Sequence, residues 1–219
     1  MSTSEESSSS STARYGDLER LLIGASDPAK AGLDDFTELA SPSSDEDPPP
    51  MTGPTPESTA LLNRAFTDKP AREEVRTSFA NADSSIVVDE GVSERAAGAA
   101  ATWMADMRQV YAQCAAWTIS IGDQEISVQV VEPAEDRSEP LQVERRFGDE
   151  ALMRTMLAGP VGQRAQITTL LVREGDRVLE LTFRSLAAES GTPEATRLDT
   201  AMSKFLELAP AKFMGLPVG

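Results

Sequence analysis

The chain has 219 residues, with 36 acidic and 20 basic side chains, 40% apolar and 5% aromatic content, and no histidine. This composition suits one modest globular domain with disordered stretches. The formal net charge of -16 argues against duplex nucleic acid and anionic membrane surfaces as partners, because binding to either relies on cationic side chains. Without histidine, Ser-His-Asp and Cys-His catalytic arrangements and histidine-based zinc sites are excluded. The single cysteine, Cys114, excludes an intramolecular disulfide and a thiolate metal cluster.

Residues 1–14 form a Ser-rich, acidic-leaning stretch that we expect to be a disordered tether, because it has almost no apolar surface to bury. It lacks the basic and apolar regions of a signal peptide, and no stretch of the chain approaches the ~20 apolar residues of a membrane span. Two interpretations remain: a cytosolic protein with a disordered start, or a domain whose export signal or anchor has been removed. We favour the second, because Ser-rich linkers commonly join a lipid anchor to a folded domain.

Residues 15–212 are expected to form a single domain. Leu18, Leu21 and Leu22 have helical spacing in a short amphipathic turn over residues 17–23. The segment 41–56 is proline-rich and acidic and predicts an exposed loop without regular structure. Because the part before this loop is too short to fold alone, we expect residues 18–39 to pack on the part of the chain after the loop.

Periodicity then predicts a helix over residues 55–66, strands over 75–80 and 84–89, a break at Gly91, and the longest helix over 93–116. The remaining expected elements are strands over 117–121, 125–131, 151–157, 163–173 and 177–186, a helix over 193–208, and a tail over 213–219. The expected fold class is α+β: an antiparallel twisted sheet of about five to seven strands packed by a long central helix, a short N-terminal helix and a C-terminal helix.

Four stretches resemble a known family: PESTALLNRAF (56–66), QVYAQCAAWTI (109–119), FGDEALMRTM (147–156) and TLLVREGDRVLELTF (169–183). Over about residues 15–210 the chain resembles the extracellular sensor-like domain of actinobacterial lipoproteins and PknH-type serine/threonine kinases. The resemblance implies an exported cell-surface domain with a ligand cleft between helices and a twisted sheet, and it implies no catalytic residue. Members usually join cysteines at the start of the first helix and the end of the long helix. Here Ser58 and Cys114 hold those positions, which predicts a free thiol.

Carboxylate pairs and clusters are the first candidates for chemistry. Asp45, Glu46 and Asp47 could chelate calcium, but the spacing lacks the alternating ligands and glycine of an EF-hand, so a solvated loop is the better interpretation. Asp149 and Glu150 could form an acid/base pair, but neighbouring residues of a strand point to opposite faces. Turn and strand-start roles are therefore favoured for these two residues.

Aromatic, basic and thiol side chains are the other candidates. Trp103, Tyr111 and Trp117 could line a binding wall, although packing of the long helix explains them better. Cys114 has no histidine to activate it and lies on an apolar stripe, which indicates an inert, buried thiol. Six arginines on or near the predicted sheet could bind an anion, but pairing with the excess carboxylates is favoured. These are Arg145, Arg146, Arg154, Arg164, Arg173 and Arg184.

We therefore predict a non-enzymatic binding or sensor-like domain at the cell surface, with no catalytic, cofactor-binding or metal-binding residue assigned and no position assigned to the ligand cleft. The expected partner is a small molecule, glycan or protein of the cell envelope, and the membrane is reached only through an anchor outside this sequence. The alternative is a structural or protein-interaction subunit of a surface or secreted assembly. A pocket would favour the first, and a flat exposed apolar patch the second.

Overall fold

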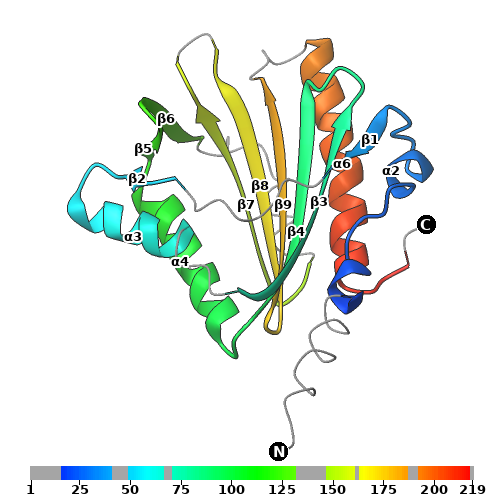
Figure 1. Ribbon diagram of the computed structural model, residues 1–219, viewed down its shortest axis with the longest axis horizontal. Helices are drawn as coiled ribbons and strands as arrows, with labels where there is room; N and C mark the ends of the chain where they lie inside the picture. The colour runs from blue at the N-terminus through cyan, green and yellow to red at the C-terminus, as the bar shows by residue number, and fades with distance from the viewer. Residues whose placement is uncertain are drawn as a thin grey trace, which may run out of the picture.

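The computed structural model describes residues 16–40, 49–66, 71–131, 147–160, 163–186 and 192–217. All nine described strands join one antiparallel sheet in the order β1-β3-β4-β9-β8-β7-β6-β5-β2, shown in Figure 1. The strands are β1 (Phe36–Leu39), β2 (Met51–Thr52), β3 (Ala71–Asn81), β4 (Ile86–Arg95), β5 (Ala116–Ile121), β6 (Gln124–Val131), β7 (Glu150–Ala158), β8 (Ala165–Glu174) and β9 (Arg177–Leu186). The helices are α2 (Asp27–Lys30), α3 (Pro56–Phe66), α4 (Ala99–Gln113) and α6 (Pro193–Phe213).

The predicted α+β class is confirmed, but the predicted number of strands was too low. The seven strands expected from apolar alternation are present, and β1 and β2 add to them. These two strands have four and two residues, with only one buried residue each, so no alternation marks them in the sequence. Because β2 lies within residues 41–56, the prediction of no regular structure there was wrong for Met51 and Thr52; residues 41–48 lie outside the described part.

The expected long helix begins later than predicted. Residues 93–95 belong to β4, and α4 starts after Gly98, which has a positive φ of 76°. Gly91 does not break the strand: it pairs with Arg76 of β3 and Glu180 of β9 in an unbroken ladder. The helix is therefore shorter than expected and is not the longest, because α6 has 21 residues and continues through Pro210 to Phe213.

The first of two hydrophobic cores lies between the sheet and α6. Thr192 caps this helix by accepting a hydrogen bond from the Ala195 amide at 3.2 Å. Phe205 is fully buried, and its ring centroid lies 5.4 to 6.2 Å from three other rings. Those rings belong to Phe36 of β1, Phe79 of β3 and Phe183 of β9. This core thus extends from the sheet centre to the β1 edge.

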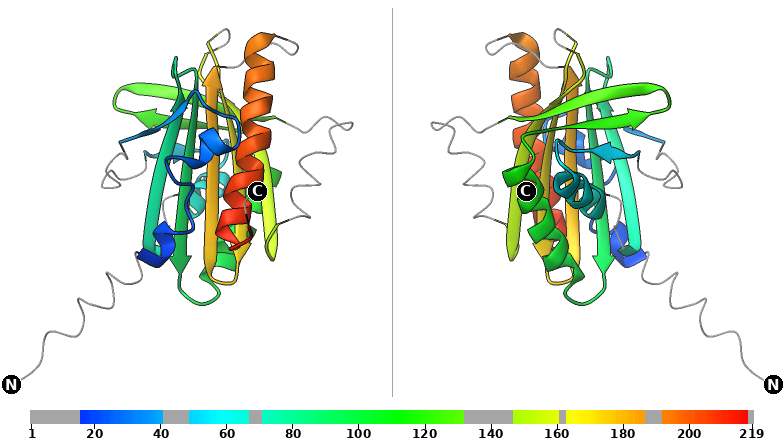
Figure 2. Two further views of the ribbon diagram at one scale, coloured as in Figure 1. Left: turned by 90° about the vertical axis from the view of Figure 1, so that its right-hand side faces the viewer. Right: turned by 90° about the vertical axis from the view of Figure 1, so that its left-hand side faces the viewer.

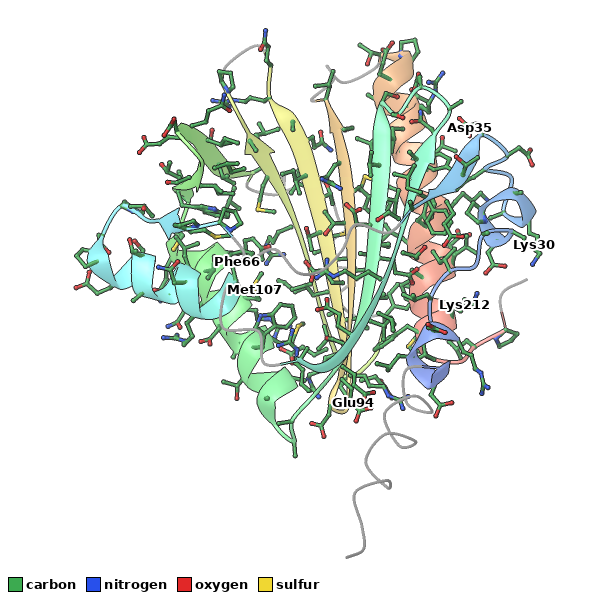
Figure 3. All side chains as sticks on the ribbon, in the orientation of Figure 1. Lys30, Asp35, Phe66, Glu94, Met107 and Lys212 are labelled. Atoms are coloured by element: carbon green, nitrogen blue, oxygen red, sulfur yellow. The ribbon has the colours of Figure 1, made fainter. Side chains whose placement is uncertain are left out.

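The second core lies on the opposite face, under α3 and α4. Figure 3 shows Phe66 of α3 close to Met107 of α4, and the helices are also joined by an ion pair between Arg64 and Asp106 at 2.8 Å. The strand residues of this core come mainly from β6, β7 and β8. The β5–β6 hairpin runs steeply across the direction of the other strands in Figure 2, as strong sheet twist requires. The helix pair therefore covers one half of this face.

The segment before β1 packs on the first core, as expected. Leu18, Leu22 and Ile23 are at most 8% exposed, and Asp27 forms a 2.5 Å ion pair with Lys212 of α6. Burial alone would raise the pKa of Asp27, but hydrogen bonds from Lys212, Gly24 and Lys30 lower it to about 2. In the described part of the chain, no helix is long and apolar enough to cross a membrane.

Glu90 of β4 lies inside the first core with 1% of its surface exposed. Its Oε2 accepts a hydrogen bond from the Ile23 amide at 2.8 Å, and its Oε1 has no hydrogen-bond partner among the described residues. Burial raises the pKa of Glu90 to about 8, although the Ile23 hydrogen bond and the charge of Lys212 lower it. Between pH 4.5 and about 8, Glu90 therefore keeps its proton in the folded protein, whereas the same side chain is ionised in the unfolded chain.

We predict that the free energy of unfolding falls as the pH rises between about 4.5 and about 8, with a contribution from Glu90 of up to about 1.4 kcal/mol per pH unit. Urea denaturation across this range measures it. Glu90→Gln should flatten the profile, because the amide cannot ionise, whereas Glu207→Gln on the exposed side of α6 should not change it. Equal profiles for wild type and Glu90→Gln would show that Glu90 does not hold this proton.

Candidate functional site

The half of the sheet face that α3 and α4 leave uncovered carries polar side chains from β3, β4 and β9. The register places Glu74 opposite Ser93, Ser78 opposite Asp89, and Asp89 opposite Thr182. Because alternate strand residues share a face, these side chains lie on the face of the second core. We call this surface the polar face and define it by Glu74, Arg76, Ser78, Asp89, Gly91, Ser93, Glu180, Thr182 and Arg184.

Ion pairs hold the side chains of the polar face in place while leaving them partly exposed. Arg76 pairs with Glu74 at 2.6 Å, with 38% and 28% of the two side chains exposed. Arg184 pairs with Asp89 at 2.6 Å, and the Ser78 hydroxyl donates to the same carboxylate at 2.8 Å. Ion pairs with this exposure add little to stability. Their donors and acceptors are well placed to meet a ligand from solvent.

Gly91 lies at the centre of the polar face, where its lack of a side chain makes room for neighbours. A Cβ at Gly91 would lie 3.5 Å from Glu74 Oε1 and 3.6 Å from Arg76 Cγ. The Glu74–Arg76 pair therefore leans over Gly91 from β3. On the other side, Glu180 of β9 is directly opposite Gly91 and is partly buried.

Arg95 is a buried cation where the polar face meets α4. It ends β4, on the same face as Ser93, and is 4% exposed. Its guanidinium carbon lies 4.2 Å from the ring centroid of Trp103, which donates from Nε1 to the Ala65 carbonyl at 2.7 Å. Burial lowers the pKa of Arg95, whereas the charges of Glu180 and Glu74 raise it. Within the described residues, Nε and Nη1 of Arg95 are buried without a hydrogen-bond partner.

Tyr111 of α4 adds an aromatic residue to the same region and is 8% exposed. Burial raises the pKa of its phenol, and the charge of Glu180 raises it further, while Arg154 of β7 lowers it. Glu180 thus acts electrostatically on both Arg95 and Tyr111. The meeting point of β4, β9 and α4 therefore combines two aromatic rings, one buried cation and carboxylates.

The aromatic candidates separate into two environments. Trp103 and Tyr111 are the buried residues described beside the polar face. Trp117 is 5% exposed and packs on Phe66, with ring centroids 6.1 Å apart. All three belong to the second core. They therefore form no exposed aromatic wall.

Asp149 and Glu150 are held by arginine rather than by each other. Arg173 donates from Nε to Glu150 and from Nη1 to Asp149, each at 3.0 Å, and Arg108 also pairs with Glu150. Asp149 further accepts a hydrogen bond from the Gly175 amide at 3.0 Å. The carboxylates thereby fasten the start of β7 to the β8–β9 turn, in agreement with the strand-start role.

The candidate arginines are not gathered into one site. Arg184 pairs with Asp89 on the polar face, whereas Arg173 pairs with Asp149 and Glu150 at the other end of the strands. Arg164 donates to the Gln129 side chain at 3.3 Å, and Arg154 donates to the Met153 carbonyl at 2.6 Å. Pairing with neighbouring groups therefore explains the candidates that can be placed. Arg145, Arg146 and the acidic triad Asp45, Glu46 and Asp47 lie outside the described residues.

Cys114 and Ser58 are both buried. Cys114 follows α4 with none of its surface exposed, and burial raises the pKa of its thiol, which opposes nucleophilic reactivity. Ser58 lies at the start of α3, where its hydroxyl accepts from the Thr55 amide and donates to the Thr55 carbonyl, each at 2.9 Å. At the position where the resemblance implies a cysteine, Ser58 thus stabilises the start of a helix.

Among the described residues, no group of three or more acidic or cysteine side chains is placed so that it could hold a metal ion. The residues that sequence analysis missed are Arg95, Glu74 and Glu180. Ending the strand at Gly91 placed Arg95 in a helix, and the two glutamates resembled ordinary strand-surface residues. The available signal was that Arg95 follows Ser93 by two residues, so that it continues the strand alternation on the same face.

The sequence matches no protein-family model and no curated protein. The fold is similar to the crystal structure of the extracellular domain of PknH from Mycobacterium tuberculosis, with a TM-score of 0.55 and 10% identity over 88% of this chain and 95% of that one. An X-ray structure of a putative uncharacterised protein from Mycobacterium smegmatis aligns over 84% of this chain and 97% of that one, with a TM-score of 0.35 and 9% identity. The predicted resemblance to the PknH-type sensor domain is confirmed for the fold.

Trp103→Phe should destabilise the protein more than Trp117→Phe, by about 1 kcal/mol. The first change removes the Nε1 hydrogen bond to Ala65 and weakens the contact with Arg95. The second removes an indole nitrogen that is buried without a hydrogen-bond partner, and both changes remove similar volume. Chemical denaturation of the two variants measures the difference. Equal losses would indicate that the Trp103 hydrogen bond adds no net stability.

Proposed function

We propose that the chain is a non-catalytic, extracytoplasmic sensor-like domain that binds a ligand on its polar face. The observation that carries the proposal is the buried Arg95 stacked on Trp103, near the partly exposed Glu74–Arg76 pair of β3; the Arg184–Asp89 pair lies farther along the same face. A sheet surface that only contacts solvent does not need a buried cation such as Arg95 at its border with α4. The likeness of the fold to the extracellular domain of PknH supports the proposed location and sensor-like role.

The absence of histidine from the sequence supports a binding role over catalysis. The one adjacent carboxylate pair considered for acid/base chemistry, Asp149 and Glu150, is held by Arg173 at the start of β7. We also propose that the Ser-rich residues 1–14 link the domain to an anchor at the cell surface, as in the lipoproteins that the sequence resembles.

The proposal is tested by a thermal-shift screen of the full chain against glycans, lipids and metabolites of the cell envelope. A ligand that binds only the folded state stabilises it by about 2.7 kcal/mol at one hundred times its Kd. We expect a dose-dependent rise in Tm with at least one member of the panel. A flat response across the panel would contradict small-ligand binding and favour a protein-interaction subunit.

Arg184→Met should abolish or reduce the ligand-induced rise in Tm, while the Tm of the free protein stays nearly unchanged. The matched control is Arg197→Met on α6. Arg197 is 53% exposed and pairs with Asp83 at 3.2 Å, whereas Arg184 is 54% exposed and pairs with Asp89 on the polar face. Both free variants should lose less than about 1 kcal/mol of stability. An equal ligand response in the two variants would place the binding surface elsewhere.

A further inference from the structure

We propose that Arg95 anchors a carboxylate group of the ligand, where the polar face meets α4. This inference rests on the proposed binding function and adds the chemical class of the ligand. The guanidinium is more than nine-tenths buried and stacks on Trp103 at 4.2 Å. Its Nε and Nη1 hydrogens point to no acceptor in the described part of the chain.

A buried guanidinium with two nitrogens that lack hydrogen-bond acceptors is costly, because the water that would hydrate them has been removed without replacement. Stacking on Trp103 stabilises the cation but uses the face of the guanidinium, so the N–H groups in its plane stay available. An oxyanion supplies acceptors in that plane and at the spacing the guanidinium requires. The missing partner of Arg95 is therefore an oxyanion.

The surrounding charges favour a singly charged oxyanion. Glu74 and Glu180 are the carboxylates that act electrostatically on Arg95, and Arg76 already neutralises Glu74 at 2.6 Å. A phosphate dianion would bring two negative charges towards both glutamates, whereas a carboxylate brings only the charge that Arg95 balances.

The side chains near Arg95 differ in their freedom to move. Glu74 and Arg76 come from β3, lean over Gly91 and are partly exposed, so they can change rotamer without movement of the sheet. The indole of Trp103 is fixed by its hydrogen bond to Ala65 at the end of α3. Arg95 is thus stacked on a fixed ring, whereas Glu74, which acts on it electrostatically, can move.

The test is an NMR titration of the full chain that follows the side-chain Nε–H signals of arginine and the indole N–H signals of tryptophan. The Arg95 signal is assigned by its loss in Arg95→Lys. The probes are acetate and inorganic phosphate, each up to about 100 mM at constant ionic strength set with chloride, since fragments this small bind weakly. Arg197 and Trp117 provide internal control signals away from Arg95.

We expect acetate to shift the Arg95 and Trp103 signals saturably, leave the control signals unchanged, and bind at least about tenfold more tightly than phosphate. No saturable shift of Arg95 with acetate, or equal binding of phosphate, would overturn the inference. Binding is read from the wild-type signals, and Arg95→Lys, which keeps the positive charge, serves only to assign the Arg95 signal. A ligand found by thermal shift that binds Arg95→Met and wild type equally would refute the carboxylate anchor and leave the proposed binding function standing.

Discussion

A strand covered by helices on both faces is apolar at successive positions, whereas a strand covered on one face alternates. This constraint explains how the molecule is arranged. In β8, Leu170, Leu171 and Val172 are all buried, because α6 lies on one side and α4 on the other. In β4, Val88 and Val92 are buried in the first core, while Asp89 and Ser93 belong to the polar face. The polar face thus exists because two short helices cover only half of a nine-stranded sheet.

Strand β4 carries two buried ionisable side chains, Glu90 and Arg95, which lie on opposite faces of the sheet. Glu90 is buried towards α6 and holds its proton, so no charge is placed in the first core at neutral pH. An arginine cannot escape in this way, because a guanidinium is not deprotonated in proteins, although burial lowers the pKa of Arg95. A buried cation with unsatisfied N–H groups is a candidate for ligand binding. This contrast is why Arg95, and not Glu90, is assigned to the ligand.

The fold was predictable where a residue pattern spans several residues. Alternation predicted the seven longer strands, including 177–186 with the observed limits, and proline and threonine at 192–193 predicted the start of α6. Prediction from the sequence failed at β1 and β2, which are too short to show a pattern. It also failed at Gly91, where pairing with strands on both sides overrides the tendency of glycine to form turns. The site was not predictable, because Arg95 and Trp103 are brought together by packing of α4 on the sheet rather than by sequence spacing.

The most direct test of the account is the free energy of unfolding of Arg95→Met compared with wild type. If Arg95 is retained for a ligand, replacing this buried cation, two of whose nitrogens lack partners among the described residues, by an apolar side chain of similar length should leave the stability within about 1 kcal/mol of wild type or raise it. Loss of the Trp103 contact is then offset by the desolvation penalty that disappears. A loss of about 3 kcal/mol or more would show that Arg95 is bound into a structural network, and would contradict its assignment to the ligand.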